Sequence, residues 1–420
     1  MRRIGCLLLL GLLCAGCAPT GTPAPRDGRE SIVPSGWESM PADKTGVKPA
    51  RAQTIKSWTT ASANGANNPR IGTLSVPPQL AYTASVGTGV GAKALSMAPP
   101  LVKDGVIYAL DAAFRLTAVH METGARIWSL ALTPRPQTAI QSVGLVIQGG
   151  LIYAVSGDGG VAAVRLNGTP AWEAKLGVPV RAHPMADDRH LYVLSADNGL
   201  HALDAATGAE RWRYQTRGAQ TSLFGMGAPV LADDKVIALF STGEVSAFDA
   251  QTGTLVWSES VLPARAFSLL GDLAGFTASP VVAGDALYVV GQNKVGAFRL
   301  STGAEIWTRD KGGAHTPRLT GNALVFVSGG ELIALNKATG AVFWRTPLTS
   351  AAAGPARWFG PTLTDTQAVV TSSAGDMVFV NVLTGKTTWE TRLDKMSVAP
   401  ILAGDRMIVL TDRAELRVYR

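Results

Sequence analysis

Apolar and polar residues alternate in short runs along most of this chain, and clusters of Gly, Asp, Asn and Pro separate the runs. From about residue 78, each unit opens with a short apolar run near a Pro, as at 279–282. A turn then leads to a β-branched and aromatic run, as at 286–289. An alternating run ending in Ala-x-Asp follows, as at 247–249, and a Thr-Gly hairpin leads to the last run. This period of two, bounded by turn residues, predicts four strands per unit and an all-β protein.

One pair of residues recurs through the chain, because a Trp follows a Gly by four positions in seven successive units. Successive tryptophans lie 44, 40, 45, 50, 37 and 45 residues apart, which is the period of a propeller blade. The Gly suits a hairpin that needs a positive φ, and the Trp on the outer strand can cover the neighbouring sheet. We therefore expect structural tryptophans rather than ligand-stacking ones. The pairs are Gly124/Trp128, Gly168/Trp172, Gly208/Trp212, Gly253/Trp257, Gly303/Trp307, Gly340/Trp344 and Gly385/Trp389.

The two ends of the repeat region predict the number of blades. Residues 416–420 align with the third strand of a unit and have no Trp strand after them. One period before Trp128 lies Tyr82, in a lone fourth strand at 79–84. Together these pieces make an eighth blade that closes the ring and removes free sheet edges. We expect one domain over 78–420, an all-β eight-bladed β-propeller of four-stranded antiparallel blades closed by its N- and C-terminal strands.

The amino terminus predicts export. Arg2 and Arg3 precede an apolar run at 7–13, and small residues lead to Cys17, which is the layout of a secretory signal. The sequence before Cys17 resembles a bacterial lipoprotein box, although Cys14 stands where Leu is usual. We expect a lipoprotein-type signal peptide at 1–16 with lipidation at Cys17; ordinary cleavage and release into the periplasm is the alternative.

Residues 17–77 are expected to form a lipid-anchored flexible tether, because their first part is rich in Pro, Gly, Ala and charge without a period of 2 or 3.6. Whether Trp58 and residues 64–69 pack on the propeller is not decided by the sequence. By resemblance to sorted lipoproteins, Ala18 after the lipidated Cys points to the outer membrane.

Charge and chemistry-bearing residues exclude several functions. The net charge of +7 falls to +5 without Arg2 and Arg3, and the remaining basic residues are scattered, so we expect no nucleic acid partner. All three Cys lie in the first 17 residues, which leaves the folded body without disulfides. The five His are expected to be solvated rim residues. Because no grouped acids, zinc pattern or nucleophile motif is present, we expect no metal, no cofactor and no catalytic residues.

The Thr-Gly-x-x-x-Trp units behind a lipoprotein-type leader resemble the PQQ-like repeat propeller family over residues 78–420. Within that family they are similar to the lipoprotein of the outer-membrane β-barrel assembly machinery. The resemblance implies a non-enzymatic scaffold on the periplasmic face of the outer membrane of a Gram-negative bacterium. It also implies docking to a POTRA-domain assembly protein, other assembly lipoproteins as partners, and unfolded outer-membrane proteins as clients that inner-strand edges could guide.

Two long connections between blades are the candidate docking surface. In that lipoprotein, an apolar-x-apolar-Arg-Gly element in the first connection docks the partner. Thr216 departs from this pattern here, and the acidic residues expected before the next blade are absent. An unpaired loop charge at Arg217, or a second connection folded onto its own blade, are the alternatives. The candidate partner-binding residues are Tyr214, Thr216, Arg217, Gly218, Leu223 and Phe224 in the first connection and Phe267, Leu269 and Leu270 in the second.

Two other functions stay open at this point. A quinoprotein-like enzyme would use the central funnel, but the folded body lacks Cys and clustered acids. A periplasmic propeller that binds a partner in a cell-envelope or polysaccharide system would share the fold and differ in its partner.

Overall fold

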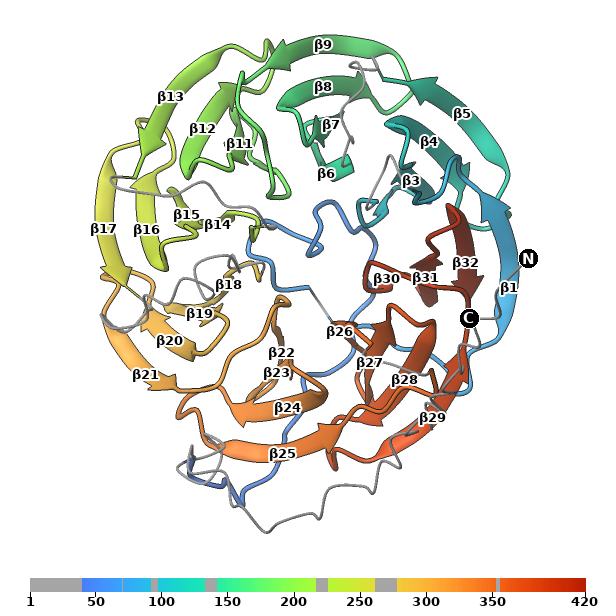
Figure 1. Ribbon diagram of the computed structural model, residues 1–420, viewed down its shortest axis with the longest axis vertical. Coiled ribbons are helices and arrows are strands. Elements are labelled where there is room, and N and C mark those ends of the chain that lie inside the picture. Colours follow the sequence, from blue (N-terminus) through green and yellow to red (C-terminus); the bar gives the residue numbers. More distant parts are fainter. Residues whose placement is uncertain are drawn as a thin grey trace, which may run out of the picture. The chain divides into compact units, whose positions relative to one another are not determined.

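The computed structural model describes residues 40–69, 71–91, 97–132, 142–216, 226–260, 278–352 and 356–420. Eight four-stranded antiparallel sheets surround a central axis (Figure 1). This confirms the predicted all-β eight-bladed propeller. In the part of the chain so described, no helix has the length and apolar character needed to cross a membrane.

The first seven blades each use four consecutive strands, and the first strand of each lies innermost (Figure 1). Blades 1 to 4 are β2 (Leu101–Lys103), β3 (Val106–Leu110), β4 (Arg115–His120) and β5 (Arg126–Ala131); β6 (Ser142–Gln148), β7 (Leu151–Ser156), β8 (Gly160–Arg165) and β9 (Pro170–Lys175); β10 (Met185–Ala186), β11 (His190–Leu194), β12 (Gly199–Asp204) and β13 (Glu210–Gln215); and β14 (Val230–Ala232), β15 (Lys235–Leu239), β16 (Glu244–Asp249) and β17 (Leu255–Ser260).

The remaining blades repeat this order, with one change in the last. Blade 8 combines three strands from the carboxyl end with one from the amino-terminal part. Blades 5 to 8 are β18 (Val281–Ala283), β19 (Ala286–Val290), β20 (Val295–Arg299) and β21 (Glu305–Arg309); β22 (Arg318–Thr320), β23 (Ala323–Ser328), β24 (Glu331–Asn336) and β25 (Val342–Pro347); β26 (Trp358–Leu363), β27 (Gln367–Ser372), β28 (Asp376–Asn381) and β29 (Thr387–Arg392); and β30 (Ile401–Ala403), β31 (Arg406–Leu410), β32 (Glu415–Tyr419) and β1 (Leu80–Ser85).

Closure of the ring depends on the pairing of β1 with β32. The two strands run antiparallel, with Tyr82 opposite Val418 and Ser85 opposite Glu415. Two reciprocal backbone hydrogen bonds between Gln79 and Arg420 extend the pair at one end. The predicted closure by the two chain ends is therefore confirmed, and β32 has no unpaired edge.

Most of the repeat tryptophans join their blade to the next one. Trp172 in blade 2 donates a hydrogen bond from Nε1 to the backbone oxygen of Ala205 in blade 3, at 2.9 Å. Its ring covers the hairpin glycine of that blade, because a Cβ on Gly208 would lie 2.5 Å from Trp172 Cε3. Six of the seven tryptophans make the same bond to the following blade: Trp128, Trp172, Trp212, Trp257, Trp307 and Trp344.

In blade 8, Tyr82 takes the tryptophan's place. Its hydroxyl donates to the backbone oxygen of Met121 in blade 1 at 2.6 Å, and its ring covers Gly124. Trp389 of blade 7 instead lies edge-on to Phe379, with ring centroids 5.1 Å apart. Six tryptophans and Tyr82 therefore contribute to the contact between neighbouring blades.

Residues 40–77 differ from the predicted flexible tether wherever the structure describes them. Trp58 is 1 % exposed and pairs with Val102 of blade 1 through two backbone hydrogen bonds of 2.7 and 2.8 Å. Ile55 and Ile71 are buried as well. Because these apolar side chains leave water and the backbone pairs with several blades, this segment belongs to the propeller body. Figure 1 shows it in blue, crossing the middle of the ring.

Candidate functional site

The two faces of the propeller carry different connections. Strands within a blade alternate in direction, so every connection from an outermost strand to the next innermost strand lies on one face, which we call the loop face. The Thr-Gly hairpins and the turns between first and second strands lie on the opposite turn face. Both predicted docking connections, from β13 to β14 and from β17 to β18, therefore begin and end on the loop face.

The structure places only part of the predicted docking surface. Tyr214, the second-last residue of β13, packs on Phe248 with ring centroids 4.5 Å apart, so it contributes to the contact between blades 3 and 4. Thr216 is buried, and its side chain offers a partner almost no surface. The other candidates, together with lipidation at Cys17, lie outside the described residues: Arg217, Gly218, Leu223, Phe224, Phe267, Leu269 and Leu270.

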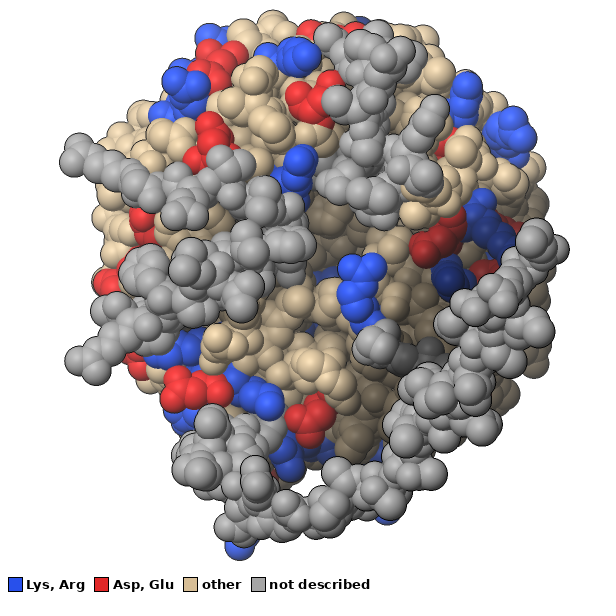
Figure 2. Space-filling model, in the orientation of Figure 1, with Lys and Arg blue, Asp and Glu red and all other residues tan. Residues whose placement is uncertain are grey.

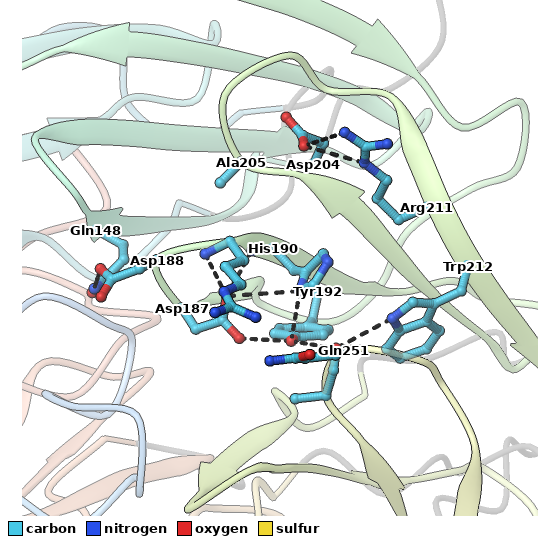
Figure 3. Close-up of polar contacts among 12 residues, drawn as sticks. Gln148, Asp187, Asp188, His190, Tyr192, Asp204, Ala205, Arg211, Trp212 and Gln251 are labelled. Carbon is cyan, nitrogen blue, oxygen red and sulfur yellow. Dashed lines mark hydrogen bonds and ion pairs between the residues drawn. The ribbon is translucent and has the colours of Figure 1, made fainter.

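Polar contacts hold blade 3 rigidly between its neighbours (Figure 3). The Tyr192 hydroxyl lies 2.7 Å from Asp187 Oδ2 and 3.0 Å from the Ala250 oxygen of blade 4, which also accepts from Trp212. Burial, reinforced by Asp187, raises the pKa of Tyr192 far above its ordinary value, so the hydroxyl keeps its proton. On the other side, Gln148 Nε2 of blade 2 donates to Asp188 at 2.6 Å. These contacts hold blade 3 to both of its neighbours at the turn face.

Two histidines are more buried than the sequence indicated, whereas His120 is exposed as expected. His201 is 2 % exposed and His190 is 9 % exposed, so neither is the solvated rim residue that was expected. His315 lies edge-on to Phe359, with centroids 5.4 Å apart. Burial lowers the pKa of His315 to about 4, with a smaller contribution from the positive charge of Arg357. His315 is therefore neutral at pH 7.

Blade 3 contains one arrangement that the sequence gave no reason to expect. Ser195 Oγ lies 3.1 Å from His201 Nε2, and His201 Nδ1 lies 2.8 Å from Glu210 Oε2. This is the order of a nucleophile, base and orienting acid. Yet Ser195 is 0 % exposed, and its hydroxyl also bonds Asp197 and the backbone of the same turn.

The corresponding turn of blade 2 repeats that pattern without a histidine. Ser156 Oγ lies 2.5 Å from Asp158 Oδ1 and bonds the backbone oxygen of Gly160. The Ser-x-Asp spacing shared by the two blades is the signal that could have predicted these turns. We therefore interpret Ser195, His201 and Glu210 as a buried structural network. Among the described residues, no group of three or more His, Cys, Asp or Glu could hold a metal ion.

The fold and the site define the class of this protein. It is an eight-bladed propeller with hydrogen-bonded seams between blades and its long connections on one face. Comparison with known proteins specifies this further. The family model of the outer membrane protein assembly factor BamB matches residues 79–173, 148–346 and 322–420. The chain belongs to this BamB family of PQQ-like repeat propellers.

Relatives and solved structures agree with this assignment. BamB of Salmonella typhimurium is 26 % identical over 275 residues, which cover 64 % of this chain and 70 % of that protein. BamB of Burkholderia pseudomallei is 26 % identical over 350 residues, covering 81 % and 88 %. The crystal structure of BamB from Moraxella catarrhalis has a TM-score of 0.67 at 18 % identity and covers 81 % of this chain and all of that one.

Proteins of another activity share the fold. A europium-containing methanol dehydrogenase has a TM-score of 0.67 at 15 % identity, covering 85 % of this chain and 90 % of the dehydrogenase. At this identity the likeness concerns the fold alone.

Proposed function

We propose that this protein is a non-enzymatic assembly factor for outer-membrane β-barrel proteins. It would act as a scaffold that docks a POTRA-domain assembly protein through the loop face, around the connection that begins at Arg217. The observation that carries the proposal is the match of the BamB family model across residues 79–420. The relatives are named as assembly factors, and the rigid blades 3 to 5 hold both long connections on one face.

A catalytic role in the central funnel has less support. The dehydrogenases share the fold with this chain but only 13 to 15 % of their sequence. Among the described residues, the arrangement with the order of a hydrolytic triad centres on a serine without solvent exposure. A buried hydroxyl that already donates to Asp197 cannot reach a substrate.

Location follows from the leader and from the family. We propose that Cys17 carries the lipid and that residues 18–39 connect it to Met40. The propeller would then lie at the periplasmic face of the outer membrane. Mass spectrometry of the mature amino terminus tests this: a diacylglyceryl-modified Cys17 supports it, and an unmodified terminus at another residue refutes it.

The docking proposal is tested by co-purification from detergent-solubilised envelope. Arg217→Glu is expected to reduce recovery of the POTRA-domain partner at least tenfold, since charge reversal at an interface arginine leaves the partner's groups unpaired. Arg213→Glu is the matched control, because Arg213 is exposed on β13 only four residues away. Equal recovery with the two variants would refute docking at Arg217.

A further inference from the structure

Residues 53–69, 71 and 72, which we call the channel plug, close the turn-face end of the central channel. Backbone hydrogen bonds join Trp58 to β2, Thr59 to β6, Gly65 to β14 and Ala66 to β18. Asn67 reaches further in, because its Nδ2 donates to the backbone oxygen of Pro280 at 3.0 Å. At its ends the plug also pairs with the turns of blades 7 and 8.

Closure at one end turns the channel into a pit that opens on the loop face. In the view of Figure 2 the ring is hollowed at its centre. Backbone pairing with the innermost strands of four blades satisfies groups that would otherwise need water, so the plug is a stable floor. Any ligand of the pit must therefore enter between the connections of the loop face.

The wall of this pit has an unusual charge pattern. The innermost strands β2, β6, β10, β14, β18, β22, β26 and β30 contain no Asp or Glu, and their two charged residues are Lys103 and Arg318. Lys103 pairs with Asp104 at the turn face. Arg181 and Arg357 precede β10 and β26, nearer to the loop face, and neither forms an ion pair with a described carboxylate. The innermost strands therefore bring positive charge and no carboxylate to the pit.

Arg318, the first residue of β22, contacts the plug and has no counter-ion among the described residues. It is 6 % exposed, and Nη1 makes a long contact of 3.5 Å to the backbone oxygen of Asn67 in the plug. Its Nε has no partner, and no described carboxylate lies within ion-pair distance. Burial lowers the pKa of Arg318 to about 10, so the guanidinium keeps its charge at pH 7. A buried charge without a partner is unfavourable unless a ligand compensates it.

We propose that the pit is a binding site for an oxyanion, a carboxylate or a phosphate group, held by Arg318 at the plug and admitted from the loop face. A guanidinium presents two parallel N–H donors, which match both kinds of oxyanion. Arg357, beside His315 and nearer to the loop face, also attracts the negative charge of an oxyanion. This function is additional to partner docking and uses different residues.

The test measures thermal unfolding of the chain from residue 18 to 420 in phosphate or acetate, at constant ionic strength set with chloride. Above the dissociation constant, the wild-type midpoint is expected to rise by about 2 °C for each tenfold increase in anion. Arg318→Met should remove this rise, and Arg213→Met on the outer strand should keep it. Comparison of phosphate with acetate shows which group binds more tightly.

A second comparison separates ligand binding from a structural role. Without added anion, Arg318→Met is expected to unfold at the wild-type temperature or above it, because methionine removes an uncompensated buried charge and keeps the volume. A lower midpoint for Arg318→Met would overturn the proposal, since Arg318 would then be a structural partner of Asn67. Equal anion dependence in wild type and Arg318→Met would also overturn it. Recovery of the POTRA-domain partner by Arg318→Met should equal wild type, so the two proposals fail independently.

Discussion

Two glycines with the same backbone conformation should respond differently to the same substitution. Gly208 and Gly177 both have φ of +76°. A Cβ at Gly208 would lie 2.5 Å from the ring of Trp172, whereas a Cβ at Gly177 would meet nothing within 4 Å. The pair therefore separates the cost of a left-handed backbone from the cost of contact with the tryptophan of the preceding blade.

The expected magnitudes follow from these distances. Left-handed backbone costs an alanine about 1–2 kcal/mol, and Gly177→Ala should lose that amount of unfolding free energy. Carbon atoms normally approach to about 3.5–4.0 Å, so Gly208→Ala also forces the indole of Trp172 away from its hydrogen bond to Ala205. Overpacking of this kind adds about 1–3 kcal/mol. We expect a total of about 2–5 kcal/mol for Gly208→Ala.

Urea denaturation followed by far-ultraviolet circular dichroism measures the free energy of unfolding of both variants. The two values are compared at equal m-values. The same comparison in a Trp172→Ala background isolates the ring, because Gly208→Ala should then cost no more than Gly177→Ala. Equal costs for the two glycines in the wild-type background would refute the role assigned to the tryptophan. So would an unchanged cost of Gly208→Ala after the ring is removed.

Two further predictions concern the pit and its plug. Because the pKa of His315 is lowered to about 4, the unfolded chain takes up a proton below pH 6.5 that the folded protein does not. Stability should therefore fall by up to about 3 kcal/mol from pH 6.5 to pH 4, and His315→Gln should lack this part of the loss in denaturation curves; parallel pH profiles would contradict it. Residues 18–420 contain no Cys, and a Cβ on Gly65 would lie 3.4 Å from Leu231 Cβ. In a chain of residues 18–420, Gly65→Cys with Leu231→Cys should therefore cross-link on mild oxidation. Gly46→Cys with Leu231→Cys is the control, and failure of the first pair to cross-link in non-reducing electrophoresis would place the plug elsewhere.

Local turn chemistry made most of the fold predictable from the sequence. Each hairpin needs a glycine and each seam needs a large aromatic ring, so the repeat is visible as Gly-x-x-x-Trp and even Tyr82 could be placed in the last blade. These requirements act over a few residues and recur at the period of a blade. The number of blades and the closure by the chain ends follow from them.

The plug and the pit could not be predicted in the same way. The plug pairs through its backbone with strands up to hundreds of residues away, and backbone pairing leaves no period in the sequence. Its only signals are isolated apolar residues in a polar segment, Ile55, Trp58 and Ile71. Arg318 likewise looks like an ordinary cation at the start of a strand. Its burial depends on Asn67, which lies 251 positions earlier.

Site-specific photocrosslinking in the intact envelope tests the central claim, docking through the loop face, most directly. A photoreactive residue at position 217 should cross-link to the POTRA-domain assembly protein. The same residue at Leu383, which is 49 % exposed in a turn-face hairpin, should not. Cross-links to that partner from Leu383 alone, or from neither position, would contradict the account.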